Sequence, residues 1–120
     1  MSTKRYMAVL RGTKGNWAAL GEARQAEIMP KYFAWADKLR AKNGFEGGSE
    51  LHETYRSLKN VKGTVHVDGP FAETKEILTG YFVYRADSVD EAAEIAKECP
   101  ALLHGDWVQV FEMPDRKEGK

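Results

Sequence analysis

The sequence has few of the features that mark secreted, membrane-bound or nucleic-acid-binding proteins. It has a single cysteine, Cys99, so no disulfide can form within the chain. It has no run of about 18 apolar residues, and its first residues lack the apolar segment of a signal peptide. Lys plus Arg and Asp plus Glu number 18 each, and this balance argues against nucleic acid or an anionic membrane as the main partner. We therefore predict a cytoplasmic protein that binds neither.

What remains is the composition of one small globular domain. Of the 120 residues, 42% are hydrophobic, which is enough for a core in a chain of this length. Neither an internal repeat nor a linker-like stretch divides the chain. We predict a single domain over residues 1–113, followed by a flexible C-terminal tail over residues 114–120.

The pattern of apolar residues predicts a mixed α+β chain. Alternating or β-branched segments predict strands at residues 4–11, 64–67, 77–85 and 106–113, with an irregular strand in 45–55. Helical spacing predicts helices at residues 17–42 and 88–99, and residues 58–62 are expected to form a turn. This order is that of a ferredoxin-like βαββαβ fold with a hairpin insertion.

Local signals predict where the two helices begin, bend and end. Pro30 lies within the first helical segment, so we expect either a kink near Met29 or a break at Pro30. Asn43 and Gly44 favour the left-handed conformation that closes a helix. The second helix begins at Ser88 with the spacing of a capping box.

One face of the predicted sheet carries apolar side chains that two helices cannot cover. Helices in folds of this kind pack on one face of an antiparallel sheet. Met7 and Val9 nevertheless face away from Tyr6, Ala8 and Leu10 in the first strand. A bare apolar face is unusual on a soluble monomer, so we predict a homodimer that pairs sheet against sheet. The alternative is that residues 45–63 fold back over this face.

A charged and stiff connection over residues 67–76, VDGPFAETKE, contains the candidate site. Asp68 begins a Gly-Pro turn, and the following Phe71 is able to anchor the loop in the core. Glu73 and Lys75 then precede Glu76 at the start of the next strand.

The candidate catalytic residues of this connection are Asp68, His66 and Glu73. A strand histidine two residues before a carboxylate is suited to acid–base chemistry near neutral pH. Each residue also has a structural interpretation, in which Asp68 caps the turn, His66 packs across the strands, and Glu73 pairs with Lys75.

The candidate substrate-binding residues lie at the mouth of the same predicted pocket. Lys75 has the charge to hold an anionic substrate, and Tyr81 offers a polar tip on an apolar body. Glu76 and Phe71 complete this set. We therefore expect a small organic molecule as the ligand.

The other chemically active residue types are assigned structural roles. His52 lies beside Glu50 and Glu53, but without fixed helical spacing this is a weak metal signal, and we predict no metal and no cofactor. His104 is interpreted as a turn residue. Cys99 is interpreted as part of the core because it lacks the electropositive setting that activates a thiol.

Several segments together resemble the YCII-related, DGPF-domain proteins. They are RYMAVLRG at 5–12, GGSEL at 47–51, DGPFAETKE-x-LTGYFVY at 68–84 and DSVDEAAEIAKECP at 87–100. The resemblance implies a ferredoxin-like subunit that pairs into a dimeric α+β barrel. It also implies similarity to isomerase-like and dehydrochlorinase-like enzymes, in which a His and an Asp in the barrel pocket are candidate catalysts.

The sequence departs from that family pattern at two points. Met113 stands where a basic residue usually precedes the final Pro, and residues 12–30 contain no histidine. The resemblance therefore leaves two functions open. One is an enzyme doing isomerase-like or lyase-like acid–base chemistry. The other is a non-catalytic dimeric accessory protein that works with an extracytoplasmic-function sigma factor, since DGPF proteins are often encoded beside such factors.

Overall fold

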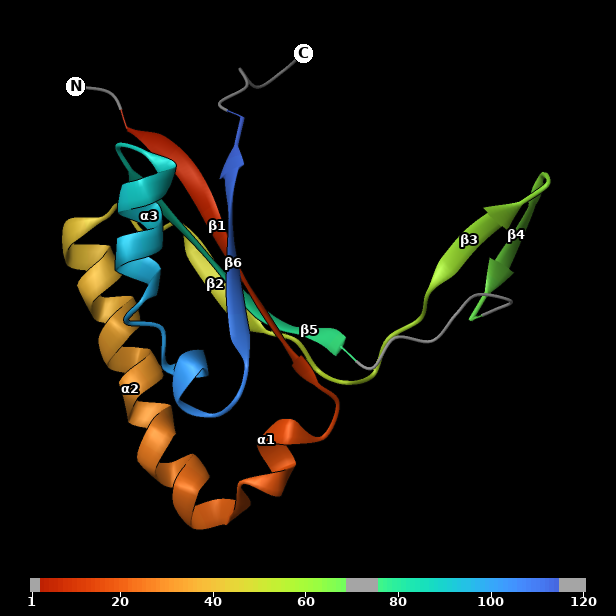
Figure 1. The fold of residues 1–120 in the computed structure, drawn as a ribbon, viewed down its shortest axis with the longest axis horizontal. Helices are drawn as coiled ribbons and strands as arrows, with labels where there is room; N and C mark the ends of the chain where they lie inside the picture. The colour runs from red at the N-terminus through yellow and green to blue at the C-terminus, as the bar shows by residue number, and fades with distance from the viewer. Residues whose placement is uncertain (1–2, 69–75, 115–120) are drawn as a thin grey trace.

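A four-stranded antiparallel sheet forms the centre of the molecule. The computed structural model describes residues 3–68 and 76–114. The sheet contains β1 (Lys4–Thr13), β2 (Gly47–Glu50), β5 (Glu76–Ala86) and β6 (Trp107–Met113), in the order β2-β5-β1-β6. This arrangement confirms the predicted α+β, ferredoxin-like architecture. Within one chain the sheet stays open and does not close into a barrel (Figure 1).

The helices lie on one face of this sheet (Figure 1). They are α1 (Asn16–Ala19), α2 (Gly21–Lys42), α3 (Val89–Ala96) and the 3₁₀ helix η1 (Pro100–Leu103). The core between helices and sheet includes Trp35 and Leu39 from α2, packed against Tyr6 and Tyr84 from the sheet. The hydroxyl of Tyr84 donates to the carbonyl oxygen of Ala92 at 2.7 Å, which ties β5 to α3.

The first helical segment is interrupted earlier than Pro30. The break lies at Leu20, between α1 and α2, and Gly21 there has a φ of 83°, which a residue with a side chain rarely adopts. Pro30 lies inside α2, so the prediction of a break at Pro30 is wrong. Pro30 is exposed, so water can reach the backbone near it. The predicted end of the helix is confirmed, with Asn43 as C-cap and Gly44 at φ 54°.

The predicted cap of α3 is also present. The Ser88 hydroxyl accepts a hydrogen bond from the Glu91 backbone N–H at 3.1 Å. The Glu91 carboxylate reaches back to the N–H of Asp87 at 2.6 Å, one residue before the cap. Ala92 and Ala96 are buried on the inner face of the helix, whereas Val89 in its first turn is exposed.

A separate two-stranded hairpin extends away from the main sheet (Figure 1). It consists of β3 (Leu58–Val61) and β4 (Thr64–Val67), and we refer to residues 58–67 as the arm. The prediction of a turn over residues 58–62 is wrong, because residues 58–61 pair as a strand. The turn is confined to Lys62 and Gly63, whose φ values of 53° and 90° are those of a tight two-residue hairpin turn.

The sheet face opposite the helices has a mixed surface, in which apolar residues lie beside the polar pair Arg11 and Gln109, whose side chains are 2.9 Å apart. Met7 lies between Val83 and Phe111, and Val9 lies between Tyr81 and Gln109. Phe111 on this open face is 44% exposed. Residues 45–63 therefore do not cover the face within one chain.

Candidate functional site

Asp68 lies at the base of the arm and closes it. Its carboxylate accepts a hydrogen bond from the Ser57 N–H at 2.9 Å and pairs with Arg56 at 3.3 Å. Its own N–H donates to the Ser57 carbonyl oxygen at 2.6 Å, and its φ is 61°. These contacts join the two ends of the arm, whereas the following turn that Asp68 was predicted to cap lies outside the described residues.

The other described candidates lie on two different parts of the molecule. His66 is on β4 of the arm, half-buried and opposite Lys59. Tyr81 is on β5, half-buried on the open face of the main sheet. Glu76 begins β5 and accepts a hydrogen bond from the Trp107 indole N–H at 2.8 Å. The three remaining candidates lie outside the described residues: Phe71, Glu73 and Lys75.

A second group of polar residues surrounds the buried carboxylate of Asp106 on the helix side of the sheet. Oδ1 of Asp106 accepts a hydrogen bond from Asn16 at 3.2 Å, and Oδ2 accepts one from the Thr79 hydroxyl at 2.9 Å. Asp106 is 7% exposed. Gly12 makes room for it, since a Cβ at that position would lie 2.0 Å from Oδ1. This carboxylate is therefore held from three other segments of the chain.

His104 lies two residues before Asp106 and is also buried. Its Nε2 and the Tyr32 hydroxyl are 2.6 Å apart. Its Nδ1 is buried without a hydrogen-bond partner among the described residues. The Trp17 ring meets the imidazole edge-on, with 5.2 Å between ring centroids. The imidazole thus has one occupied and one unused nitrogen.

Burial governs the ionisation of the neighbouring groups. Burial raises the pKa of Tyr32, and the nearby Cys99 and Asp106 raise it further. Burial also raises the pKa of the Cys99 thiol to about 11. A backbone hydrogen bond at Ala101 lowers this pKa, and the charge of Asp106 raises it. Both groups therefore keep their protons at neutral pH.

The tautomer of His104 decides what its unused nitrogen offers. If the protonated Tyr32 donates to Nε2, the neutral imidazole carries its proton on Nδ1, which is then a donor. If Nε2 donates to the Tyr32 oxygen instead, Nδ1 has a lone pair and acts as a base. We refer to the half-buried Tyr32 together with the buried His104 and Asp106 as the buried triad, in which Tyr32 contacts His104 and Asp106 bonds to Asn16 and Thr79.

The local sequence explains how one turn carries two members of the buried triad. Pro100 begins η1, and the helix ends at His104. Gly105 follows with a φ of 91°, a conformation that favours glycine. The Asp106 N–H then bonds back to the Ala101 carbonyl oxygen at 3.2 Å.

The sequence interpretation missed this group because it assigned His104 to a turn and Asp106 to a strand end. The His-Gly-Asp spacing directly before a strand was the available signal. That spacing alone does not identify a site, because the contacts that define the site come from segments distant in the sequence.

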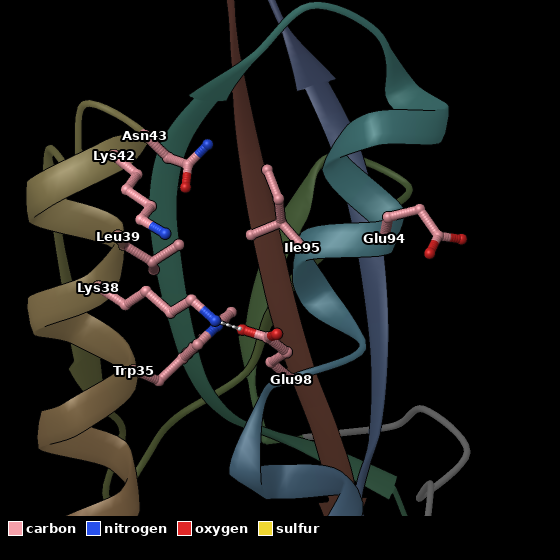
Figure 2. Close-up of a pocket in the computed structure, with 8 residues that line it drawn as sticks. All are labelled: Trp35, Lys38, Leu39, Lys42, Asn43, Glu94, Ile95 and Glu98. Carbon is pink, nitrogen blue, oxygen red and sulfur yellow. Dashed lines mark hydrogen bonds and ion pairs between the residues drawn. The ribbon is translucent and has the colours of Figure 1, made fainter.

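A shallow cleft of about 260 Å³ lies elsewhere, between α2 and α3. Figure 2 shows Lys38 and Glu98 reaching across it, and their charged groups are 2.8 Å apart. None of the sequence-predicted site residues lines this cleft, and neither does any member of the buried triad. It is a groove spanned by a surface ion pair.

Two further findings bear on the kind of site. Among residues 3–68 and 76–114, no group of three or more His, Cys, Asp or Glu side chains is placed to hold a metal ion. Within the same part of the chain, none of the helices combines the length and apolar character needed to cross a membrane.

Fold and site together define a small α+β protein with an open antiparallel sheet and a buried turn that carries His104 and Asp106. The chain belongs to the YCII-related domain family, whose model matches residues 5–114. It is also similar to an uncharacterized protein, R00369, of Rhizobium meliloti (strain 1021), with 49% identity over 35 residues. That match covers 29% of this chain and 28% of the relative's length.

Proposed function

We propose that this YCII-family protein is a small enzyme that moves a proton on a small organic molecule, with His104 as the group that gives or takes it. The observation that carries the proposal is a buried imidazole with one nitrogen 2.6 Å from Tyr32 and an Nδ1 that has no hydrogen-bond partner among the residues the structure describes. Most buried polar side-chain atoms have a hydrogen-bond partner, so an Nδ1 without one among the described residues supports a role beyond packing. Proton transfer of this kind is the step that isomerases and lyases share.

Tyr32 and Asp106 act through their neighbours in this proposal. Tyr32 holds the His104 ring through its contact with Nε2, and because its pKa is raised it keeps its own proton at neutral pH. Asp106 accepts hydrogen bonds from Asn16 in α1 and Thr79 in β5, which fixes the turn that carries His104. Both are positioning residues rather than reacting groups.

Substrate access to His104 requires α1 to move. This helix has four residues, none of them buried, and Trp17 from it lies against the imidazole. Gly15 and Gly21, with φ values of 84° and 83°, flank it on either side. Few contacts and two glycine junctions are the properties of a segment that opens at low energetic cost.

The proposed enzyme works as a homodimer that covers its open sheet face. Met7, Phe111 and Trp107 are apolar residues on that face, and two of them are more than 40% exposed. Apolar faces of this kind are covered in soluble proteins, most often by a second copy in two-fold symmetry.

Deuterium exchange tests the proton-transfer proposal on small molecules that carry an acidic C–H bond. A panel of 2-oxo acids, 3-oxo esters and 2-hydroxy acids is incubated with the protein in D₂O, and loss of each acidic C–H signal is followed by NMR. We expect exchange that His104→Gln slows at least about 100-fold, the usual contribution of a positioned acid or base.

Matched variants separate this site from the one predicted on the arm. His52→Gln and His66→Gln are expected to leave the exchange rate within twofold of wild type. Unchanged exchange in His104→Gln would contradict the proposal. Loss of deuterium exchange in His66→Gln or Asp68→Asn would instead place the chemistry on the arm.

A second candidate function is that of a non-catalytic accessory protein that binds a regulatory partner, such as an extracytoplasmic-function sigma factor. His104 and Asp106 are only 9% and 7% exposed, so a substrate does not reach them without a structural change. This burial favours a non-catalytic role. Absence of exchange across the panel, together with capture of a purified sigma factor, would favour this function.

A further inference from the structure

We propose that the arm of one copy packs its apolar face on a second copy of this chain, and that two arms are exchanged reciprocally in the dimer. This inference rests on the homodimer proposed above and adds to it a second contact surface, separate from the open sheet face. It assigns a role to the hairpin insertion, whose conformation a single chain does not explain.

The arm has one apolar face, and that face is bare. Leu58 pairs with Val67, and Asn60 pairs with Val65 two residues along, so these side chains share a face. Leu58 is 63% exposed, and Val65 and Val67 are 57% exposed. An isolated two-stranded hairpin is at best marginally stable in water, so this face needs a partner surface.

Among residues 3–68 and 76–114 the arm finds no such surface on its own chain. It extends away from the main sheet and its helices (Figure 1). The radius of gyration is 16.7 Å, whereas a compact chain of this length has about 14 Å. The connecting residues 51–57 are all exposed as well.

The exposed area points to a second copy as the occupant. The chain exposes 8442 Å², whereas a compact monomer of 13.5 kDa exposes roughly 6,500 Å². The excess is larger than the roughly 800 Å² that each partner buries in a standard interface, and it falls in the range of obligate dimers. Stable pairing therefore has sufficient surface available.

Charge and symmetry also fit a second copy. The formal net charge is zero, so no long-range repulsion opposes self-association. In two-fold symmetry each arm contact is made twice, which doubles its contribution to the free energy of association.

The test measures the dimer dissociation constant of the full chain by sedimentation at several concentrations. The variant Val65→Thr/Val67→Thr keeps the β-branched shape that strands favour and adds only hydroxyl groups to the apolar face. We expect its dissociation constant to rise at least tenfold. Val61→Thr makes the same change on the opposite face of the arm, and it is expected to stay within twofold of wild type.

Cross-linking gives a second measurement that does not depend on these variants. Cys99 is buried, so Thr64→Cys supplies the reactive thiol for a benzophenone maleimide. Mixing ¹⁴N- and ¹⁵N-labelled protein before irradiation identifies links between copies. We expect mixed-isotope links from the arm to the partner.

The outcomes separate this inference from the dimer itself. A dimer that Val65→Thr/Val67→Thr does not weaken, with links only within one chain, would overturn the role of the arm and leave the homodimer intact. A wild-type chain that stays monomeric at tens of micromolar would overturn both, and the bare arm would then serve a different partner.

Discussion

Gly12 in β1 and Asp106, the residue before β6, are in direct contact, because a Cβ on Gly12 would lie 2.0 Å from Oδ1 and 2.5 Å from Cγ of Asp106. The missing side chain at Gly12 is thus the space that the carboxylate occupies. Asp106 in turn holds Asn16 and Thr79. One glycine therefore supports the hydrogen bonds that position the turn with His104.

Gly12→Ala should destabilise the protein by about 2–4 kcal/mol, because the added methyl group displaces a buried, hydrogen-bonded carboxylate. Urea unfolding measures the free energy. The control is the same change in an Asp106→Ala background, where the clash is absent and the added cost should fall below about 1 kcal/mol. If Gly12→Ala lowered the free energy of unfolding equally in both backgrounds, the contact with Asp106 would not be the reason for a glycine at this position.

Trp17→Ala should expose His104 to solvent. The Trp17 ring lies against the imidazole, and the helix that carries it has no buried residue. We expect modification of His104 by diethyl pyrocarbonate to become at least tenfold faster in the variant, as followed by mass spectrometry. The exposed His52 serves as the internal reference and should react at the same rate in both proteins. If His104 reacted as fast as His52 in the wild type, Trp17 would not be shielding His104 from solvent.

The stability of the protein should fall at alkaline pH, in part through Cys99. Its folded pKa of about 11 is above the unfolded thiol value of roughly 8.5. The neutral thiol therefore favours the folded state fully below pH 8.5, and this contribution is lost as the pH rises toward 11. We expect a loss of up to roughly 3–3.5 kcal/mol from this group. Cys99→Ala should flatten the decline between pH 8.5 and 11, and an unchanged slope would contradict the assignment.

Much of the fold follows from local sequence patterns. The alternation over residues 4–11 and 106–113 predicts both strands and both of their faces, since side chains on a strand point to opposite sides in turn. The cap at Ser88 is equally local. Pro30 was misleading, because the conformation of Gly21 set the break between the helices instead.

The buried triad was beyond such patterns because long-range contacts create it. Asp106 meets Asn16 from 90 residues away and Thr79 from 27 residues away, and no periodicity relates these positions. The sequence around His104 indicates only a loop residue, and its contacts with Tyr32 and Trp17 are visible only in the folded structure. The conspicuous charge after Asp68 drew the site prediction to a different connection.

Phe111→Ser should weaken the dimer through the open sheet face. Phe111 lies beside Met7 across the β1–β6 pairing, and removing its ring deletes apolar area that a partner sheet would cover. We expect at least a tenfold increase in the dimer dissociation constant, measured by sedimentation, with the free energy of unfolding of the monomer almost unchanged because the ring is 44% exposed. The matched control is Phe33→Ser, which removes an exposed ring from α2 on the opposite side of the molecule. If Phe33→Ser weakened the dimer and Phe111→Ser did not, the partner copy would contact the helices rather than the sheet.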